Sequence, residues 1–222
     1  SMVGAFTQGA FRGSQAILGV AFVQNLYGNA GLVPLMIVAS VPLYNIFSVL
    51  VLTVTAPDAR TADHHGVVRR TLRGIITNPI ILGILLGVPF SLLRVKLPGI
   101  LASTLSTIGG TATPVALLAV GASFSGSEAA KCMKPALAAT AIKLFILPAI
   151  FLPIAALFGF TGSAMIAILI LVGSPTTVSC YVMAKNMGHR GVLTSNVVML
   201  ATVLSSVSLT LWIFLLRLFG LL

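Results

Sequence analysis

The sequence predicts an all-α polytopic membrane protein with seven transmembrane helices, and three observations support this fold class. The chain of 222 residues is 58% hydrophobic and only 7% charged, and its mean hydropathy is +1.12. A soluble domain carries roughly a quarter of charged residues. The apolar residues also come in runs of about 20 or more, the length that crosses a hydrocarbon core of about 30 Å. The number and positions of these apolar runs therefore predict the number and positions of the transmembrane helices.

Seven apolar runs are separated by short stretches rich in Gly, Pro and charged residues, which are typical of the joints between helices. We predict spans at residues 5–27, 31–54, 74–93, 99–124, 135–158, 162–184 and 192–219.

The formal net charge of +10 indicates a membrane protein rather than a nucleic-acid-binding protein, because the basic residues lie between the apolar runs. One side of the predicted bundle collects Arg12, Arg60, Arg69, Arg70, Arg73, Lys131, Lys134, Lys185 and Arg190, and the other collects Arg94, Lys96 and Arg217. Positive residues favour the cytoplasmic side. Residues 55–73 are thus predicted to form a cytoplasmic basic loop that meets anionic head groups of the bilayer.

The sequence predicts no metal site and no cofactor. His64 and His65 lie in the basic loop without a third ligand nearby, so we interpret them as part of a solvated loop. Cys132 and Cys180 belong to no CxxC pattern and are interpreted as inert thiols.

Two short stretches resemble each other and predict an inverted repeat. Residues 20–35 read VAFVQNLYGNAGLVPL and residues 181–195 read YVMAKNMGHRGVLTS, and each gives Asn, Gly and Gly after an apolar helix. Because the two copies are five spans apart, they lie in opposite orientations, as in many secondary transporters. A five-helix unit predicts ten helices in all, so we expect three more before Ser1. Residues 1–54 then hold the last two helices of the first repeat, and residues 74–222 hold the second repeat.

The sixth span carries a proline in its middle. Four hydroxyl side chains surround Pro175 in the stretch GSPTTVSCYVMAKNMG: Ser174, Thr176, Thr177 and Ser179. One interpretation is a proline kink whose freed carbonyl groups bond to these hydroxyls. We favour the other, a discontinuous helix that lines a transport site, because residues 8–19 in the matching half are also polar and rich in glycine.

Three stretches together resemble the auxin efflux carrier family in its bacterial form. They are FTQGAFRGSQAILGVAFVQNLYGNAGL, ITNPIILGILLGV and GSPTTVSCYVMAKNMG, and the resemblance runs over essentially the whole chain. It implies ten helices in two inverted repeats of five, with the fourth and ninth helices broken and crossing at the substrate site. Family members export auxin in plants or carry malate, malonate and similar carboxylates in bacteria.

The resemblance also implies that Gly13, Ser14 and Gln15 lie at the substrate site, with Pro175 as the crossover proline. Many bacterial relatives carry Asn after FRG or FRS, whereas this chain has Ser14. A hydroxyl is shorter than an amide and offers one donor rather than two. We therefore expect a substrate range that differs from those relatives.

Lys143 lies about 13 Å into the fifth span, near the middle of the membrane. We expect it to attract an anionic substrate or to pair with an acid in the preceding helices, since intramembrane charges face the interior. The alternative is a lysine that snorkels to the head groups. Arg12 is interpreted either as lining the entrance or as an interfacial anchor.

The acidic residues are Asp58, Asp63 and Glu128, and none lies within a predicted span. This absence disfavours transport of cations. We predict a secondary transporter for small organic anions in the cell membrane, which works by alternating access and is not an enzyme. The alternatives are a sodium-coupled symporter of the bile-acid type and, more remotely, an assembly protein or intramembrane enzyme. The oligomeric state stays open, with a homodimer as one candidate.

Overall fold

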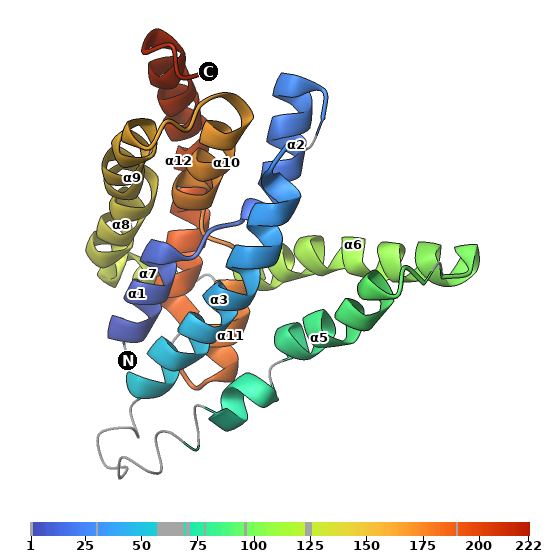
Figure 1. Cartoon of the computed structure of the whole chain (residues 1–222). Helices are drawn as coiled ribbons and strands as arrows, with labels where there is room; N and C mark the ends of the chain where they lie inside the picture. Colours follow the sequence, from blue (N-terminus) through green and yellow to red (C-terminus); the bar gives the residue numbers. More distant parts are fainter. Residues whose placement is uncertain are drawn as a thin grey trace.

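The computed structural model describes residues 2–29, 31–56, 69, 72–77, 79–95, 97–122, 126–189 and 191–222 (Figure 1). The predicted cytoplasmic loop at 55–73, with His64 and His65, lies largely outside them. The regular structure of the described part is helical throughout, which confirms the predicted fold class. Its elements are α1 (Met2–Phe11), α2 (Gln15–Tyr27), α3 (Val33–Val54), α5 (Pro79–Leu92), α6 (Gly99–Ala122), α7 (Gly126–Lys131), α8 (Met133–Ala141), a π-helical turn η2 (Ile142–Ile146), α9 (Leu147–Leu157), α10 (Gly162–Gly173), α11 (Ser179–Asn186) and α12 (Gly191–Leu218).

Four continuous helices in the described part are long and apolar enough to cross a membrane: Val33–Val54, Gly99–Ala122, Met133–Leu157 and Gly191–Leu218. The third of these joins α8, η2 and α9. The first and sixth predicted spans are each made of two shorter helices in series. In the third predicted span, residues 72–76 are helical and α5 begins at Pro79. A proline at the first position of a helix costs no intrahelical hydrogen bond.

The helices α8 to α12 and the segments α1 to α3 form the main bundle, and α5 and α6 extend away from it to one side (Figure 1). Most side chains of α6 are exposed.

Small residues let α1 approach α8 and α12 closely. Ala5 on α1 packs with Ala136 and Ala139 on α8, and all three are buried. A methyl group on Gly9 would lie 3.1 Å from a methyl carbon of Val197 on α12. Helices in a membrane associate mainly through such close packing. This contact holds α1 beside the two longest spans.

A second cluster of larger side chains holds α10 in place. Ile166 and Ile170 of α10 pack with Leu152 of α9, Val23 of α2 and Leu209 of α12, and all are buried. This cluster and the α1 contact lie on either side of the breaks in the two interrupted spans. Buried contacts therefore fix the positions of the helix ends at these breaks.

The two interrupted spans run in opposite directions. In Figure 1, α1 and α11 lie in the lower half of the bundle, and α2 and α10 lie in the upper half. Gly28 after α2 and Gly188 after α11 both adopt left-handed backbone conformations, with φ of +73° and +76°. Glycine adopts this conformation without steric cost. The two stretches that the sequence pairs as a repeat therefore end their half-helices in the same way.

Candidate functional site at the helix crossover

The break between α10 and α11 follows directly from Pro175. A proline disfavours helical backbone at the residue before it, and Ser174 accordingly has φ −68° and ψ 150°, which is extended. Helix α10 ends at Gly173, and the chain resumes helical geometry at Ser179. The prediction of a discontinuous helix at Pro175 is thus confirmed.

The break between α1 and α2 spans Arg12, Gly13 and Ser14 and contains no proline. The backbone N–H of Ser14 donates to the carbonyl oxygen of Pro175 at 2.8 Å. The Thr176 hydroxyl donates to the carbonyl oxygen of Gly9 at 2.8 Å. Each break therefore provides a hydrogen-bond donor to a backbone carbonyl group of the other interrupted span. These two bonds hold the two interrupted spans together.

Gly13 lies where the segments approach most closely. A methyl group at this position would lie 2.4 Å from the Ser174 hydroxyl oxygen, 3.0 Å from Nζ of Lys143 and 3.3 Å from Oε1 of Gln15. The first of these distances is shorter than real contacts of a methyl group. Only glycine fits here without displacing its neighbours.

Lys143 lies behind this crossing and is fully buried, at 0% exposure. Its ammonium group donates to the carbonyl oxygens of Phe11 at 3.0 Å and of Leu171 at 3.2 Å. Phe11 is the last residue of α1, and Leu171 lies in the last turn of α10. The lysine thus binds the carboxyl ends of both half-helices.

The π-helical turn η2 carries Lys143. Such a turn leaves the regular hydrogen-bond pattern of the helix, and π turns are frequent at functional sites. The indole N–H of Trp212 on α12 donates to the carbonyl oxygen of Leu144 within this turn, at 2.9 Å. Trp212 therefore supports the segment from which Lys143 reaches the crossing.

Arg12 is buried as well, at 5% exposure. Its guanidinium donates to Oδ1 of Asn45 at 2.8 Å and to the Ser48 hydroxyl at 3.2 Å, both on α3, and it contacts the sulfur of Met183 on α11. These contacts place Arg12 inside the bundle, between the crossing and α3.

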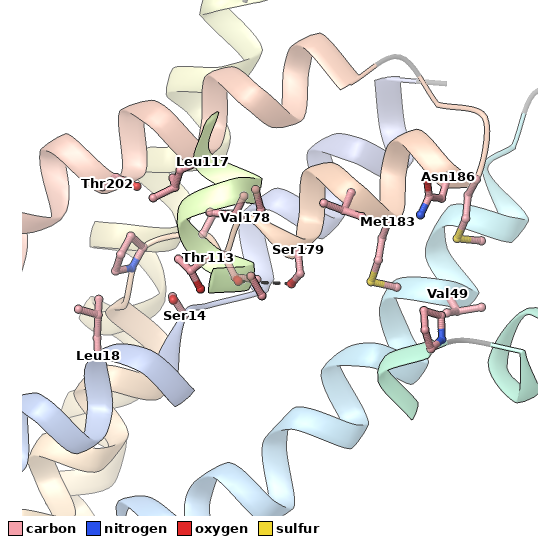
Figure 2. Close-up of a pocket in the computed structure, with 18 of the residues that line it drawn as sticks. Ser14, Leu18, Val49, Thr113, Leu117, Val178, Ser179, Met183, Asn186 and Thr202 are labelled. Carbon is pink, nitrogen blue, oxygen red and sulfur yellow. Dashed lines mark hydrogen bonds between the residues drawn. The ribbon is translucent and has the colours of Figure 1, made fainter. Parts of the chain in front are cut away.

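A cavity of about 800 Å³ opens beside the crossing (Figure 2). The start of α2 contributes Ser14 and Leu18 to its wall, and the second break contributes Pro175 to Ser179. Thr113 and Leu117 of α6 also line this cavity. Figure 2 shows the hydroxyl groups of Ser14, Thr113 and Ser179 near the same region, and a dashed line marks the 3.3 Å hydrogen bond between the Thr177 and Ser179 hydroxyls.

A second, smaller cavity of about 170 Å³ lies on the Arg12 side of the crossing. Its lining includes Arg12, Tyr44 and Asn45 together with Gly13, Ser14, Gln15, Thr177 and Ser179. Ser14, Thr177 and Ser179 therefore line both cavities. The crossing lies between a large, mostly apolar cavity and a small cavity that is lined by the buried side chain of Arg12.

The two helices that begin at the crossing have uncapped amino ends. No side-chain hydrogen bond caps α2 at Ser14 or α11 at Val178. The first turn of a helix carries a partial positive charge and leaves backbone N–H groups without the usual partner four residues back. In α11 the N–H groups of Cys180 and Tyr181 donate instead to the carbonyl oxygens of Thr177 and Val178, at 3.0 Å each. Both starts lie on the wall of the larger cavity, which therefore receives the positive ends of two helices.

The structure brings most of the predicted site residues together. Ser14, Pro175, Thr176, Thr177 and Ser179 line the larger cavity, and Gly13 and Gln15 line the smaller one. Lys143 lines neither of these two cavities, and Ser174 is fully buried at the crossing without lining either.

Several residues at the site were missed by the sequence reasoning. Asn45 and Ser48 of α3 are the main partners of Arg12, and Thr113 of α6 reaches the larger cavity. Asn45 stands out in the apolar run VPLYNIFSVL, and a polar residue in such a run signals an interior position. Thr113 carried no comparable signal, because hydroxyl side chains are frequent throughout that span.

A family model described as "Membrane transport protein" matches residues 10–213. This match includes the crossing, both cavities and α12 up to Ile213. Neither a comparison with curated proteins nor one with solved structures finds a match.

Proposed function

The chain belongs to the membrane transport protein family, that of the auxin efflux carriers, and on this premise we propose that it is a secondary carrier for small organic anions. The substrates that we propose are carboxylates, either auxin-like acids or dicarboxylates such as malate and malonate. They would bind at the crossing of the two broken helices.

The observation that carries this proposal is the pair of uncapped helix starts beside the larger cavity. Helices α2 and α11 both begin there, and no side chain caps either start. Helix amino ends bind carboxylates and phosphates through free N–H groups and the helix dipole. Ser14, Thr177 and Ser179 add hydroxyl donors next to these ends.

The charges near the crossing favour an anion in the same way. Arg12 brings a buried cationic group to the wall of the smaller cavity. The three acidic residues of the chain, Asp58, Asp63 and Glu128, lie outside the predicted spans. An organic cation would meet positive helix ends and a basic side chain, and no carboxylate is among the described residues that line either cavity.

The lining of the larger cavity favours a carboxylate on a partly apolar body. Beyond the polar groups at the crossing, its wall is made of Leu18, Leu117, Val182 and Met183 among other apolar residues. Sites for small organic molecules usually combine such an apolar wall with a few placed polar groups. Auxin-like acids fit this description, whereas short dicarboxylates would depend on the polar groups at the crossing.

Transport would proceed by alternating access, with one helical unit moving against the other around the crossing. We place the carrier in the cell membrane and include a homodimer in the proposal. The family match and the two broken helices support alternating access.

The test replaces the two hydroxyl groups at the start of α11 with isosteric or smaller apolar groups. We expect Thr177→Val combined with Ser179→Ala to raise the KM for carboxylate exchange about tenfold or more, since a hydrogen bond to a charged group contributes about 1.5–3 kcal/mol. The matched control is Thr104→Val combined with Ser103→Ala on exposed α6, whose hydroxyls bond to their own helix. An unchanged KM in the Thr177→Val, Ser179→Ala variant would mean that the hydroxyl groups at the start of α11 do not bind the substrate.

A further inference from the structure

The carboxyl ends of two half-helices converge on Lys143. Its ammonium group lies 3.0 Å from the carbonyl oxygen of Phe11 in α1 and 3.2 Å from that of Leu171 in α10. The Tyr44 hydroxyl also donates to the Leu171 oxygen, at 3.2 Å. Among the described residues no carboxylate pairs with Lys143. Its partners are backbone carbonyl groups.

The charges at this point balance. A helix carboxyl end carries a partial charge of about −0.5, so two of them together approximate one negative charge. One buried ammonium group offsets it. In carriers with broken helices, such carboxyl ends and unwound carbonyl groups are where a coupling Na⁺ binds. Lys143 supplies a cation of the same charge from within the chain.

Two further oxygen atoms lie around the same point without partners. The hydroxyl oxygen of Ser174 and Oε1 of Gln15 are buried, and neither has a hydrogen-bond partner in the described part of the chain. A methyl group on Gly13 would contact both of them and also Nζ of Lys143. Two carbonyl oxygens thus bind the lysine tip, and one hydroxyl and one amide oxygen lie near it without a hydrogen bond to it. Oxygen ligands of this kind suit a hard cation.

We propose that this region is a monovalent cation site that Lys143 fills permanently, so that the chain needs no sodium ion at its crossing. The part of this inference that concerns transport rests on the proposed carrier function, and the part that concerns the site does not. A lysine fixed in the site compensates the helix ends in every step of the cycle. Substrate uptake is then independent of sodium, which separates this carrier from a sodium-coupled symporter.

Thermal unfolding of the purified full-length protein tests the site without any transport. We expect the Tm of the wild type to be the same in NaCl and in choline chloride at equal ionic strength. Lys143→Ala should lower the Tm by about 5 °C or more in choline chloride, because the buried Phe11 carbonyl loses its lysine donor and the Leu171 carbonyl keeps only the Tyr44 hydroxyl. NaCl or methylammonium chloride should restore part of this loss, since small cations can enter the vacated site.

The matched control is Lys134→Ala, which removes an exposed lysine from the same span. Its Tm should equal that of the wild type in each salt. Three results would overturn the proposal: an unchanged Tm for Lys143→Ala, a lowered Tm that neither cation restores, or a sodium-dependent Tm of the wild type.

A second pair of variants covers the case in which Lys143→Ala does not fold. Lys143→Arg keeps the charge, and Lys143→Met keeps the length of the side chain without it. We expect the arginine variant to yield more folded protein than the methionine variant, and the reverse order would contradict a role for the charge. Uptake of a labelled carboxylate by the wild type should be equal in NaCl and in choline chloride. Uptake only in NaCl would contradict the proposed sodium independence, but it would still agree with the proposed function as a carrier for organic anions.

Discussion

Gly13 lies where the two broken helices meet, and three polar atoms fill the space beside its Cα. We predict that Gly13→Ala destabilises the protein by about 1–3 kcal/mol, the usual cost of overpacking. The added methyl group would lie 2.4 Å from the Ser174 hydroxyl oxygen, so Ser174 or the backbone must move. Thermal unfolding of the purified protein measures this loss.

Gly109→Ala is the control for this prediction. A methyl group at Gly109 on α6 would meet no atom within 4 Å. Alanine favours a helix over glycine by up to about 1 kcal/mol, so this variant should be as stable as the wild type or slightly more so. Equal stability of the Gly13 and Gly109 variants would mean that the crossing tolerates a side chain.

Single residues at the site could be predicted from sequence where they break a pattern. A lysine in ATAIKLFILPAIF and a proline among hydroxyls in GSPTTVSC are conspicuous in apolar spans. The partners of Lys143 were not predictable in this way. Every residue has a carbonyl group, so the sequence does not mark Phe11 and Leu171 as the residues that accept hydrogen bonds from a lysine far away in the chain.

The interrupted helix α10–α11 is the element on which the site depends. We predict that Pro175→Ala lowers carboxylate exchange at least about tenfold, the effect of roughly 1.4 kcal/mol. Without the proline, Ser174 loses its restriction to extended backbone, and α10 can continue past Gly173. In a continuous helix the carbonyl group of residue 175 would no longer accept the hydrogen bond from the Ser14 N–H. The backbone N–H groups at the start of α11 would then be bonded within the helix. Exchange of labelled carboxylate in proteoliposomes measures the loss.

Pro153→Ala serves as the matched control, because Pro153 is an exposed proline inside the continuous helix α9. It should leave exchange near the wild-type rate. Full activity of Pro175→Ala would show that the proline is not needed to keep the helix open.

The elements were predictable to different degrees. Seven apolar runs give the helices, and Pro175 marks one break, since both follow from local sequence. The break at Gly13 is less distinct, because no proline marks it and its neighbour Ser174 lies far away in sequence. The π-helical turn at Lys143 carried no signal, because its sequence IKLFI also suits a regular α-helix.

At the scale of the whole molecule, the two interrupted spans run antiparallel and exchange hydrogen bonds at their breaks. This arrangement agrees with the inverted relation that the two Asn-Gly-Gly stretches predict. The ten-helix architecture and the three helices expected before Ser1 stay predictions. The family and the all-helical fold were predictable because they depend on composition and on motifs spread over the chain. The opening of the larger cavity between α6 and the crossing was not, since it depends on how distant helices pack.

The most direct measurement is counterflow of carboxylates in proteoliposomes that contain the full-length protein in a sodium-free buffer. Vesicles loaded with unlabelled malate should accumulate labelled malate, and external malonate or an auxin-like acid should compete, whereas choline should not. Positive helix ends and hydroxyl groups at the crossing predict this preference for anions. Accumulation of an organic cation, or no exchange of any carboxylate above vesicles without the protein, would contradict a carrier for organic anions.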